Sequence, residues 1–182
     1  NTYETVQKNN QSLLEAGSIC VLDQTQSDVV GYSTGWNMAK GYLLSKLQWN
    51  NSLNQEELLR EFFRHYYDDA ADVMYDIFME QRLWMNHVYN DLDANGDVYE
   101  DMITQAYWPY NWLENILNRF DEAYAALEPL RERDQERYAL IHDRILLETL
   151  QFRYIKLSLY YAEYDERELL STRQAFKYDC ER

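Results

Sequence analysis

The segment Asp91 to Met102 carries much of the spacing that a calcium-binding loop requires. Oxygen-bearing side chains occupy alternate positions from Asp91 to Asp97, and Gly96 stands where such a loop turns sharply. The last position of the loop needs a glutamate that supplies two oxygens, and Met102 stands there instead. Two interpretations stay open, namely a calcium site that lacks one ligand, or an acidic turn between helices. We expect no tight calcium binding and predict no metal site.

Adjacent carboxylates occur at Glu56-Glu57, Asp68-Asp69 and Glu100-Asp101. Glycoside hydrolysis needs two carboxylates that flank a single glycosidic bond. Neighbouring residues on a helix point about 100° apart, so the members of these pairs do not face each other. The pairs stand at expected helix starts, where the helix dipole favours negative charge. We therefore predict no catalytic residue in this chain.

The segment Tyr107 to Trp112 is rich in aromatic side chains, which can stack on sugar rings but more often pack into a core. The histidines His65, His87 and His142 lie on expected helices, and we expect no second ligand in helical register with any of them. The sequence has no zinc-protease motif, no serine-nucleophile motif and no glycine-rich phosphate loop. No cofactor is predicted.

Helices must position these residues, because the chain has only five glycines and two prolines to break them. The one expected strand is Ser18 to Asp23, a short apolar run that follows Gly17 and leads into a polar segment. A single strand cannot pair its own backbone groups, so we expect its neighbours in a preceding part of a longer polypeptide. The expected helices cover Thr2 to Ala16, Asn37 to Gln48, a stretch from Asn54, a stretch capped by Asp68 or Asp69, a stretch from Pro109 to about Arg131, a stretch from Asp134, and Glu166 to Tyr178.

The helix that begins at Asn54 has the clearest start. The Asn54 side chain can cap it, Glu57 stands at the capping-box position, and Leu53 can pack onto Leu58.

The helix after Asp134 carries two apolar stripes, which predicts burial on two sides and a central position in a bundle. The stripes are Tyr138, Ile141, Ile145, Phe152, Ile155 and Leu159, and Leu147, Leu150, Tyr154, Leu157 and Tyr161.

The formal net charge of −15 comes from 32 acidic and 17 basic residues. This balance argues against nucleic-acid binding and against attraction to anionic membranes. No apolar run approaches the ~20 residues of a membrane span. Cys20 and Cys180 are far apart in the sequence, and we expect no disulfide between them.

Two stretches resemble a recurrent segment of bacterial proteins of unknown function that are related to α-glucuronidases and β-hexosaminidases. They are Gly41 to Asn50, which reads Gly-Tyr-Leu-Leu-Ser-Lys-Leu-Gln-Trp-Asn, and Glu61 to Tyr67, which reads Glu-Phe-Phe-Arg-His-Tyr-Tyr. In those proteins a (β/α)8 barrel ends in a strand, and a leucine-rich helix follows. A glycine follows their tyrosine pair, whereas this chain has Asp68. The resemblance covers mainly residues 13–80.

The resemblance implies a mainly α chain in which residues 1–32 end a (β/α)8 barrel and residues 33–182 form a C-terminal bundle of about six helices. Active sites of such barrels lie at the C-terminal ends of the strands. It therefore implies that Asp23 and Gln24, at the end of the expected strand, contact substrate. Trp36, a few residues on, either offers a stacking face to sugar or packs in the core.

The first functional hypothesis is that the chain is the C-terminal portion of a carbohydrate-active glycoside hydrolase. The chain closes and stabilises the barrel and contacts carbohydrate, and the catalytic carboxylates lie on earlier strands. Its partners are then carbohydrate and the upstream barrel, in an extracellular or periplasmic protein. The alternative is a free-standing acidic helical interaction module that meets a basic partner or binds calcium.

Overall fold

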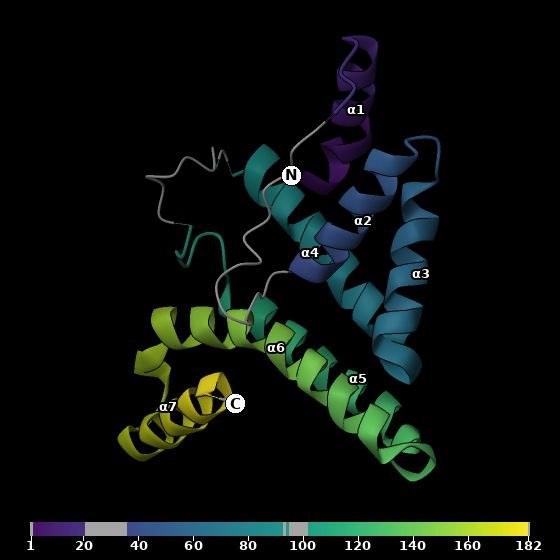
Figure 1. The fold of residues 1–182 in the computed structure, drawn as a ribbon. Helices are drawn as coiled ribbons and strands as arrows, with labels where there is room; N and C mark the ends of the chain where they lie inside the picture. The colour runs from purple at the N-terminus through teal and green to yellow at the C-terminus, as the bar shows by residue number, and fades with distance from the viewer. Residues whose placement is uncertain (1, 21–35, 93, 95–101, 182) are drawn as a thin grey trace.

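The computed structural model describes residues 2–20, 36–92, 94 and 102–181, and these residues are mainly helical. Six helices, α2 to α7, follow α1, so the predicted mainly α fold class is confirmed (Figure 1). The α-helices are α1 (Thr2–Glu15), α2 (Asn37–Trp49), α3 (Gln55–Tyr67), α4 (Ala71–Asn90), α5 (Tyr110–Arg133), α6 (Gln135–Leu159) and α7 (Glu166–Glu181). Two short 3-10 helices are η1 (Asp68–Ala70) and η2 (Tyr161–Glu163).

The long helices α5 and α6 form an antiparallel hairpin that organises the bundle (Figure 1). Helix α4 packs against both α5 and α3. Helix α2 packs against α3 on one side and against α1 on the other. Helix α7 turns back and contacts α6.

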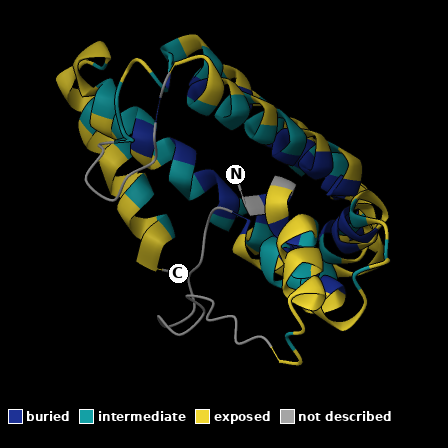
Figure 2. Ribbon diagram, turned by 90° about the horizontal axis from the view of Figure 1, so that it is seen from above, coloured by how far each residue is buried: buried dark blue, intermediate teal, exposed yellow. Residues whose placement is uncertain are grey.

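One hydrophobic core runs through helices α1 to α6, with buried residues on their facing sides (Figure 2). Leu59 and Phe63 of α3, Phe78 of α4 and Phe120 of α5 are almost fully buried in it. Tyr3 of α1 belongs to the same core. The predicted domain boundary between residues 32 and 33 lies outside the described residues and stays a prediction.

The expected strand from Ser18 to Asp23 is not formed in its described part. Ser18, Ile19 and Cys20 have no regular secondary structure, and Ile19 is fully exposed. Strands need a neighbouring backbone to pair with, and the residues described here contain no strand that could serve. Residues 21–23 lie outside the described part of the chain. Of residues 1–32, which the resemblance implies to be the end of a barrel, the described residues 2–20 form α1 and no strand, so they do not support a barrel end.

The chain reversal after α1 follows the glycine that the sequence places there. Gly17 has a φ of 79°, and the Ser18 N–H donates to the Leu13 carbonyl at 3.0 Å. The Gly17 N–H donates to the Leu14 carbonyl at the same distance. This is the hydrogen-bond pattern with which helices commonly end at a left-handed glycine, and it confirms the predicted stop.

Helix α3 begins at its predicted cap. The Asn54 Oδ1 accepts from the Glu56 N–H at 2.9 Å and from the Glu57 N–H at 3.2 Å. The Glu57 side chain is exposed, and Leu53 packs against the core. Helix α6 likewise begins at Asp134, whose side chain accepts from the Arg137 N–H at 3.0 Å.

The two apolar stripes of α6 have different surroundings. Ile141, Ile145, Phe152 and Ile155 of the first stripe are buried. In the second stripe, Tyr154 and Tyr161 are more than half exposed. Helix α6 contacts α3, α5 and α7, which confirms its predicted central position. None of the described helices is long and apolar enough to cross a membrane.

We predict that Asn54→Ala lowers the free energy of unfolding by about 1 kcal/mol, because two N–H groups of α3 lose their acceptor. Denaturant titration followed by circular dichroism measures this change. Glu57→Ala is the matched control and should cost less, because Glu57 contributes its backbone N–H to the cap. An unchanged midpoint for Asn54→Ala would show that the cap does not stabilise the helix.

Candidate functional site

Trp36, one of the predicted substrate-binding residues, is buried at the start of α2 and is 3% exposed. Its backbone has φ 61° and ψ 28°, a left-handed conformation that a residue with a bulky side chain rarely adopts. Its N–H donates to the Glu148 Oε2 at 3.1 Å, and its carbonyl accepts from the Tyr3 hydroxyl at 3.0 Å. Its indole N–H donates to Gln81. Side chains from α1, α4 and α6 thus hold this one residue, and we call this group the Trp36 clamp.

Glu148 is the central polar residue of the Trp36 clamp. It is 3% exposed and is the one charged residue of the described chain that is buried. Trp36 provides no side-chain cap for α2, and the first turn of α2 has no acidic residue. The Glu148 carboxylate therefore supplies negative charge at the start of α2, where the helix dipole favours it. Sequence reasoning missed Glu148, because 112 residues separate it from Trp36.

Aromatic rings enclose the Trp36 indole. Its ring centroid lies 5.7 Å from that of Phe63, 6.4 Å from that of Tyr67 and 5.6 Å from that of Phe78. Burial raises the pKa of the Tyr3 phenol, and the charge of Glu148 raises it further. Of the two roles proposed for Trp36, the described residues give it the packing role. Its contact with sugar stays a prediction, and Asp23 and Gln24 lie outside the described residues.

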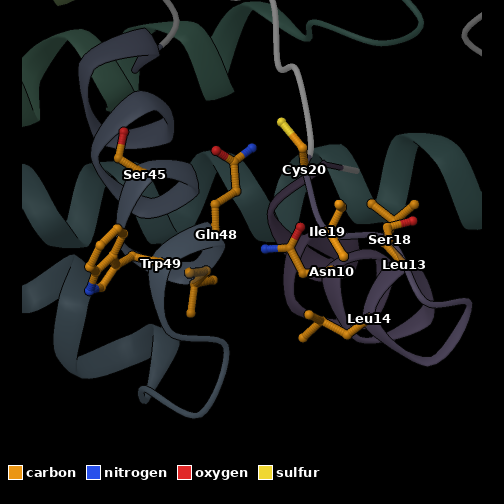
Figure 3. A pocket seen from close by; sticks show the side chains of 10 residues that line it. Asn10, Leu13, Leu14, Ser18, Ile19, Cys20, Ser45, Gln48 and Trp49 are labelled. Atoms are coloured by element: carbon orange, nitrogen blue, oxygen red, sulfur yellow. The ribbon is translucent and has the colours of Figure 1, made fainter.

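A pocket of ≈ 360 Å³ lies between the C-terminal ends of α1 and α2 (Figure 3). Gln48 approaches it from α2, and Cys20 lies on the opposite side beyond α1. The lining residues are uncharged, and Ile19 and Trp49 are 102% and 93% exposed. They are Asn10, Leu13, Leu14, Ser18, Ile19, Cys20, Ser45, Leu47, Gln48 and Trp49. We call this uncharged surface the α1–α2 end.

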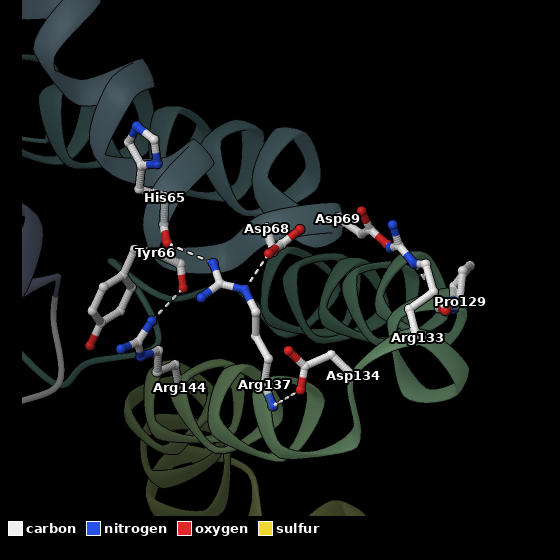
Figure 4. Close-up of polar contacts among 9 residues, drawn as sticks. All are labelled: His65, Tyr66, Asp68, Asp69, Pro129, Arg133, Asp134, Arg137 and Arg144. Carbon is white, nitrogen blue, oxygen red and sulfur yellow. Dashed lines mark hydrogen bonds and ion pairs between the residues drawn. The ribbon is translucent and has the colours of Figure 1, made fainter.

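Asp68 and Asp69 bind arginines rather than capping α4 (Figure 4). The Asp68 carboxylate pairs with Arg137, and the Asp69 carboxylate pairs with Arg133. The expected cap is therefore wrong, and α4 begins at Ala71 without a side-chain cap. The two pairs tie the end of α3 to the α5–α6 hairpin, which gives both carboxylates a structural role.

The backbone of Asp68 has a φ of 51°, which glycine adopts far more readily than aspartate. This is the position at which the resembling proteins have glycine. Here the Arg137 guanidinium binds the Asp68 side chain and donates to the His65 carbonyl at 3.3 Å. Arg144 donates to the Tyr66 carbonyl at 2.8 Å and lies over the Tyr66 ring. These contacts hold the end of α3 in its unusual turn.

Most of the segment with calcium-loop spacing lies outside the described residues. Asp91 ends α4, and its carboxylate lies 2.6 Å from the His87 Nδ1. The expectation that His87 has no partner in helical register is therefore wrong. The Met102 carbonyl accepts from the Trp108 indole N–H at 2.7 Å. Within the described chain no three potential ligands gather around one point, and the expectation that calcium does not bind tightly here stays a prediction.

The aromatic segment from Tyr107 to Trp112 packs against α4. The Trp84 indole N–H donates to the Tyr107 carbonyl at 2.7 Å, and the Trp84 and Trp112 rings stack at 5.2 Å. The Trp108 side chain is 6% exposed. These contacts favour the packing interpretation of this segment over sugar stacking.

We predict that Glu148→Ala lowers the free energy of unfolding by about 1–3 kcal/mol, because the buried Trp36 N–H loses its acceptor. Glu148→Gln should cost less, because the amide oxygen can still accept this hydrogen bond. Glu132→Ala on the exposed side of α5 is a control for loss of a carboxylate. Equal losses in Glu148→Ala and Glu132→Ala, measured by denaturant titration, would contradict the role of the clamp.

Residues 2–79 match the model of a family described as "Domain of unknown function (DUF4838)". The match covers fewer than half of the 182 residues and contains the α1–α2 end, Trp36 and the Asp68-Asp69 pair. It also contains both stretches that carry the resemblance to glycoside-hydrolase-like proteins. Searches of curated proteins and of solved structures found no match.

Proposed function

We propose that this chain is the C-terminal portion of a carbohydrate-active, glycoside-hydrolase-like protein, in which it braces a (β/α)8 barrel formed by a preceding part of the polypeptide. The resemblance of Gly41 to Asn50 and of Glu61 to Tyr67 supports this assignment. These residues build most of α2 and about half of α3, and α2 packs against both α1 and α3. The observation that carries the bracing role is the uncharged α1–α2 end.

The α1–α2 end differs in character from most of the chain. Charged residues make up 27% of the sequence, yet the described residues that line the pocket include none of them. Leu14, Ile19 and Trp49 each have more than half of their surface exposed there. Exposed apolar patches of this kind mark interaction surfaces. Ser18 to Cys20, where the expected barrel strand begins, are part of this surface, so the barrel is its natural partner.

The contacts of the described carboxylates support the proposal that this chain does not supply the catalytic residues of glycoside hydrolysis. Asp68 and Asp69 are bound by arginines, and Glu148 is buried beneath Trp36. Glycoside hydrolysis needs an acid and a second carboxylate that both reach the substrate. The proposal therefore assigns the catalytic pair to the barrel. It also places the protein outside the cell or in the periplasm.

The proposed contacts with substrate come from the end of the expected strand. Asp23 can accept hydrogen bonds from sugar hydroxyls, and Gln24 can both donate and accept them. The Trp36 clamp fixes the chain twelve residues after Gln24, at the start of α2. This position suits an anchor for a segment that must present polar side chains to a ligand.

A free-standing acidic interaction module is the second candidate, and the net charge of −15 is the observation that favours it. Such a module would meet a basic partner through its acidic surface, and the α1–α2 end would have no special role. Substitutions at that end distinguish the two candidates.

We predict that Trp49→Glu combined with Leu14→Glu exposes the junction between barrel and bundle to protease in the complete polypeptide. The reason is that two charges would then be buried against the barrel, which is costly. The same pair should leave the thermal midpoint of the isolated chain nearly unchanged, since both side chains are exposed in it. Leu83→Glu, on the exposed side of α4, is the matched control. Unchanged proteolysis in the double variant would contradict docking at this end.

We further predict that Asp23→Ala or Gln24→Ala weakens oligosaccharide binding by the complete polypeptide by several-fold, the loss expected for one hydrogen bond. Asp68→Ala should leave the affinity unchanged, because its carboxylate binds Arg137. Calorimetry with candidate oligosaccharides measures these affinities. Normal binding in both of the first two variants, with weaker binding in Asp68→Ala, would place the sugar site elsewhere.

A further inference from the structure

Helix α7 is attached to the bundle differently from the other α-helices. It lies beside α6 and packs against it (Figure 1). None of its residues is buried, whereas helices α1 to α6 all contribute residues to the hydrophobic core. The residues of α7 that are partly buried recur every three or four positions, and they are Leu169, Thr172, Phe176 and Asp179. A helix held by so little apolar burial can open while the rest of the protein stays folded.

Two neighbouring contacts join the C-terminal half of α7 to α6. Arg153 of α6 pairs with Asp179 at 2.7 Å, and the two side chains are only 21% and 20% exposed. The Arg153 guanidinium also lies 5.5 Å from the centroid of the Phe176 ring. The Phe176 ring in turn stacks on the Tyr154 ring at 6.4 Å. We call these four residues the α7 latch.

The other end of α7 is fastened through the segment that precedes it. Residues 160–165 connect α6 to α7, and we call them the elbow. The Tyr160 hydroxyl donates to the Trp108 carbonyl at 2.9 Å, and the Lys156 ammonium lies 5.4 Å from the centroid of the Tyr164 ring. At 1.5 Å per residue, the length of α7 places the latch roughly 20 Å from the elbow. The helix is thus held at both of its ends.

We propose that α7 is a hinged arm, which opens from α6 about the elbow while the other helices stay folded, and which the α7 latch holds closed. Opening breaks the Arg153–Asp179 pair and separates Phe176 from Tyr154, so it uncovers the guanidinium and one ring face on α6. It takes no residue of α7 out of the core, because the core contains none. The arm lies outside the matched residues 2–79, and its opening does not depend on a barrel.

Hydrogen exchange of the backbone amides, measured on the 182-residue chain by NMR or mass spectrometry, tests the arm. A helix of 16 residues is only marginally stable alone in water, so α7 loses its amide protection when it opens. We expect the amides of α7 to exchange about a hundredfold or more faster than those of the buried Ile145 and Phe152 of α6. Equal protection of α7 and these α6 amides would overturn the proposal, because α7 would then open only when the whole bundle unfolds.

Asp179→Asn tests the latch. It removes the charge that binds Arg153 and should speed exchange throughout α7 by roughly tenfold, the effect of losing one hydrogen bond between charged groups. The amide of Leu169, ten residues away, should respond as strongly as that of Phe176, because the arm opens as one unit. The midpoint of denaturant unfolding should stay the same, since α7 buries none of its residues.

Glu181→Gln is the matched control, because it removes the same charge from an exposed side chain of the same helix. It should leave exchange in α7 nearly unchanged. Similar effects of Asp179→Asn and Glu181→Gln would overturn the role of the latch. Faster exchange in Asp179→Asn that is confined to the last turn of α7 would also overturn the proposal, because fraying of a helix end would then explain it.

Discussion

The hydrogen bond from the Trp36 N–H to the Glu148 carboxylate is the contact on which the arrangement of this bundle depends. A buried carboxylate is costly to remove from water and is tolerated only where donors surround it. Here the Gln151 amide donates to it at 3.3 Å, in addition to the Trp36 N–H at 3.1 Å. The bond joins the start of α2 to the middle of α6. Because Tyr3 and Gln81 bind the same tryptophan, α1 and α4 meet at this point as well.

The position of α1 follows from that junction. Tyr3 fixes the first turn of α1, and the Tyr3 carbonyl accepts from the Gln55 amide at 2.7 Å. One turn later Gln7 donates to the carbonyls of Asn51 and Leu53 at 2.7 and 3.0 Å. These polar contacts fasten one half of α1 to the turn between α2 and α3. The other half, with Leu13 and Leu14, extends past this attachment and leaves the uncharged α1–α2 end open to a partner.

Local features of the fold could be predicted from the sequence, because short-range chemistry determines them. Asn54 caps α3 through N–H groups only two and three residues away, and Gly17 ends α1 within one turn. The role of Glu148 could not be predicted in this way, because no local sequence pattern indicates that its carboxylate accepts a hydrogen bond from Trp36, 112 residues away. The same holds for Asp68, which reads as a helix cap but binds Arg137, 69 residues away. The described part of the expected strand, Ser18 to Cys20, has no regular structure for a related reason, since an apolar run becomes a strand only beside another backbone.

Negative charge determines which surfaces of this molecule can bind a partner, just as burial of apolar side chains determines its core. The 22 acidic residues before position 134 make non-specific association of copies unfavourable over most of the chain. Attraction is then favoured where charge is absent, as it is among the described residues that line the α1–α2 end. This end lies away from the α5–α6 hairpin in the bundle (Figure 1). In the proposed assembly, a barrel at the α1–α2 end is therefore connected to the rest of the bundle through the Trp36 clamp, which joins α1 and the start of α2 to α4 and α6.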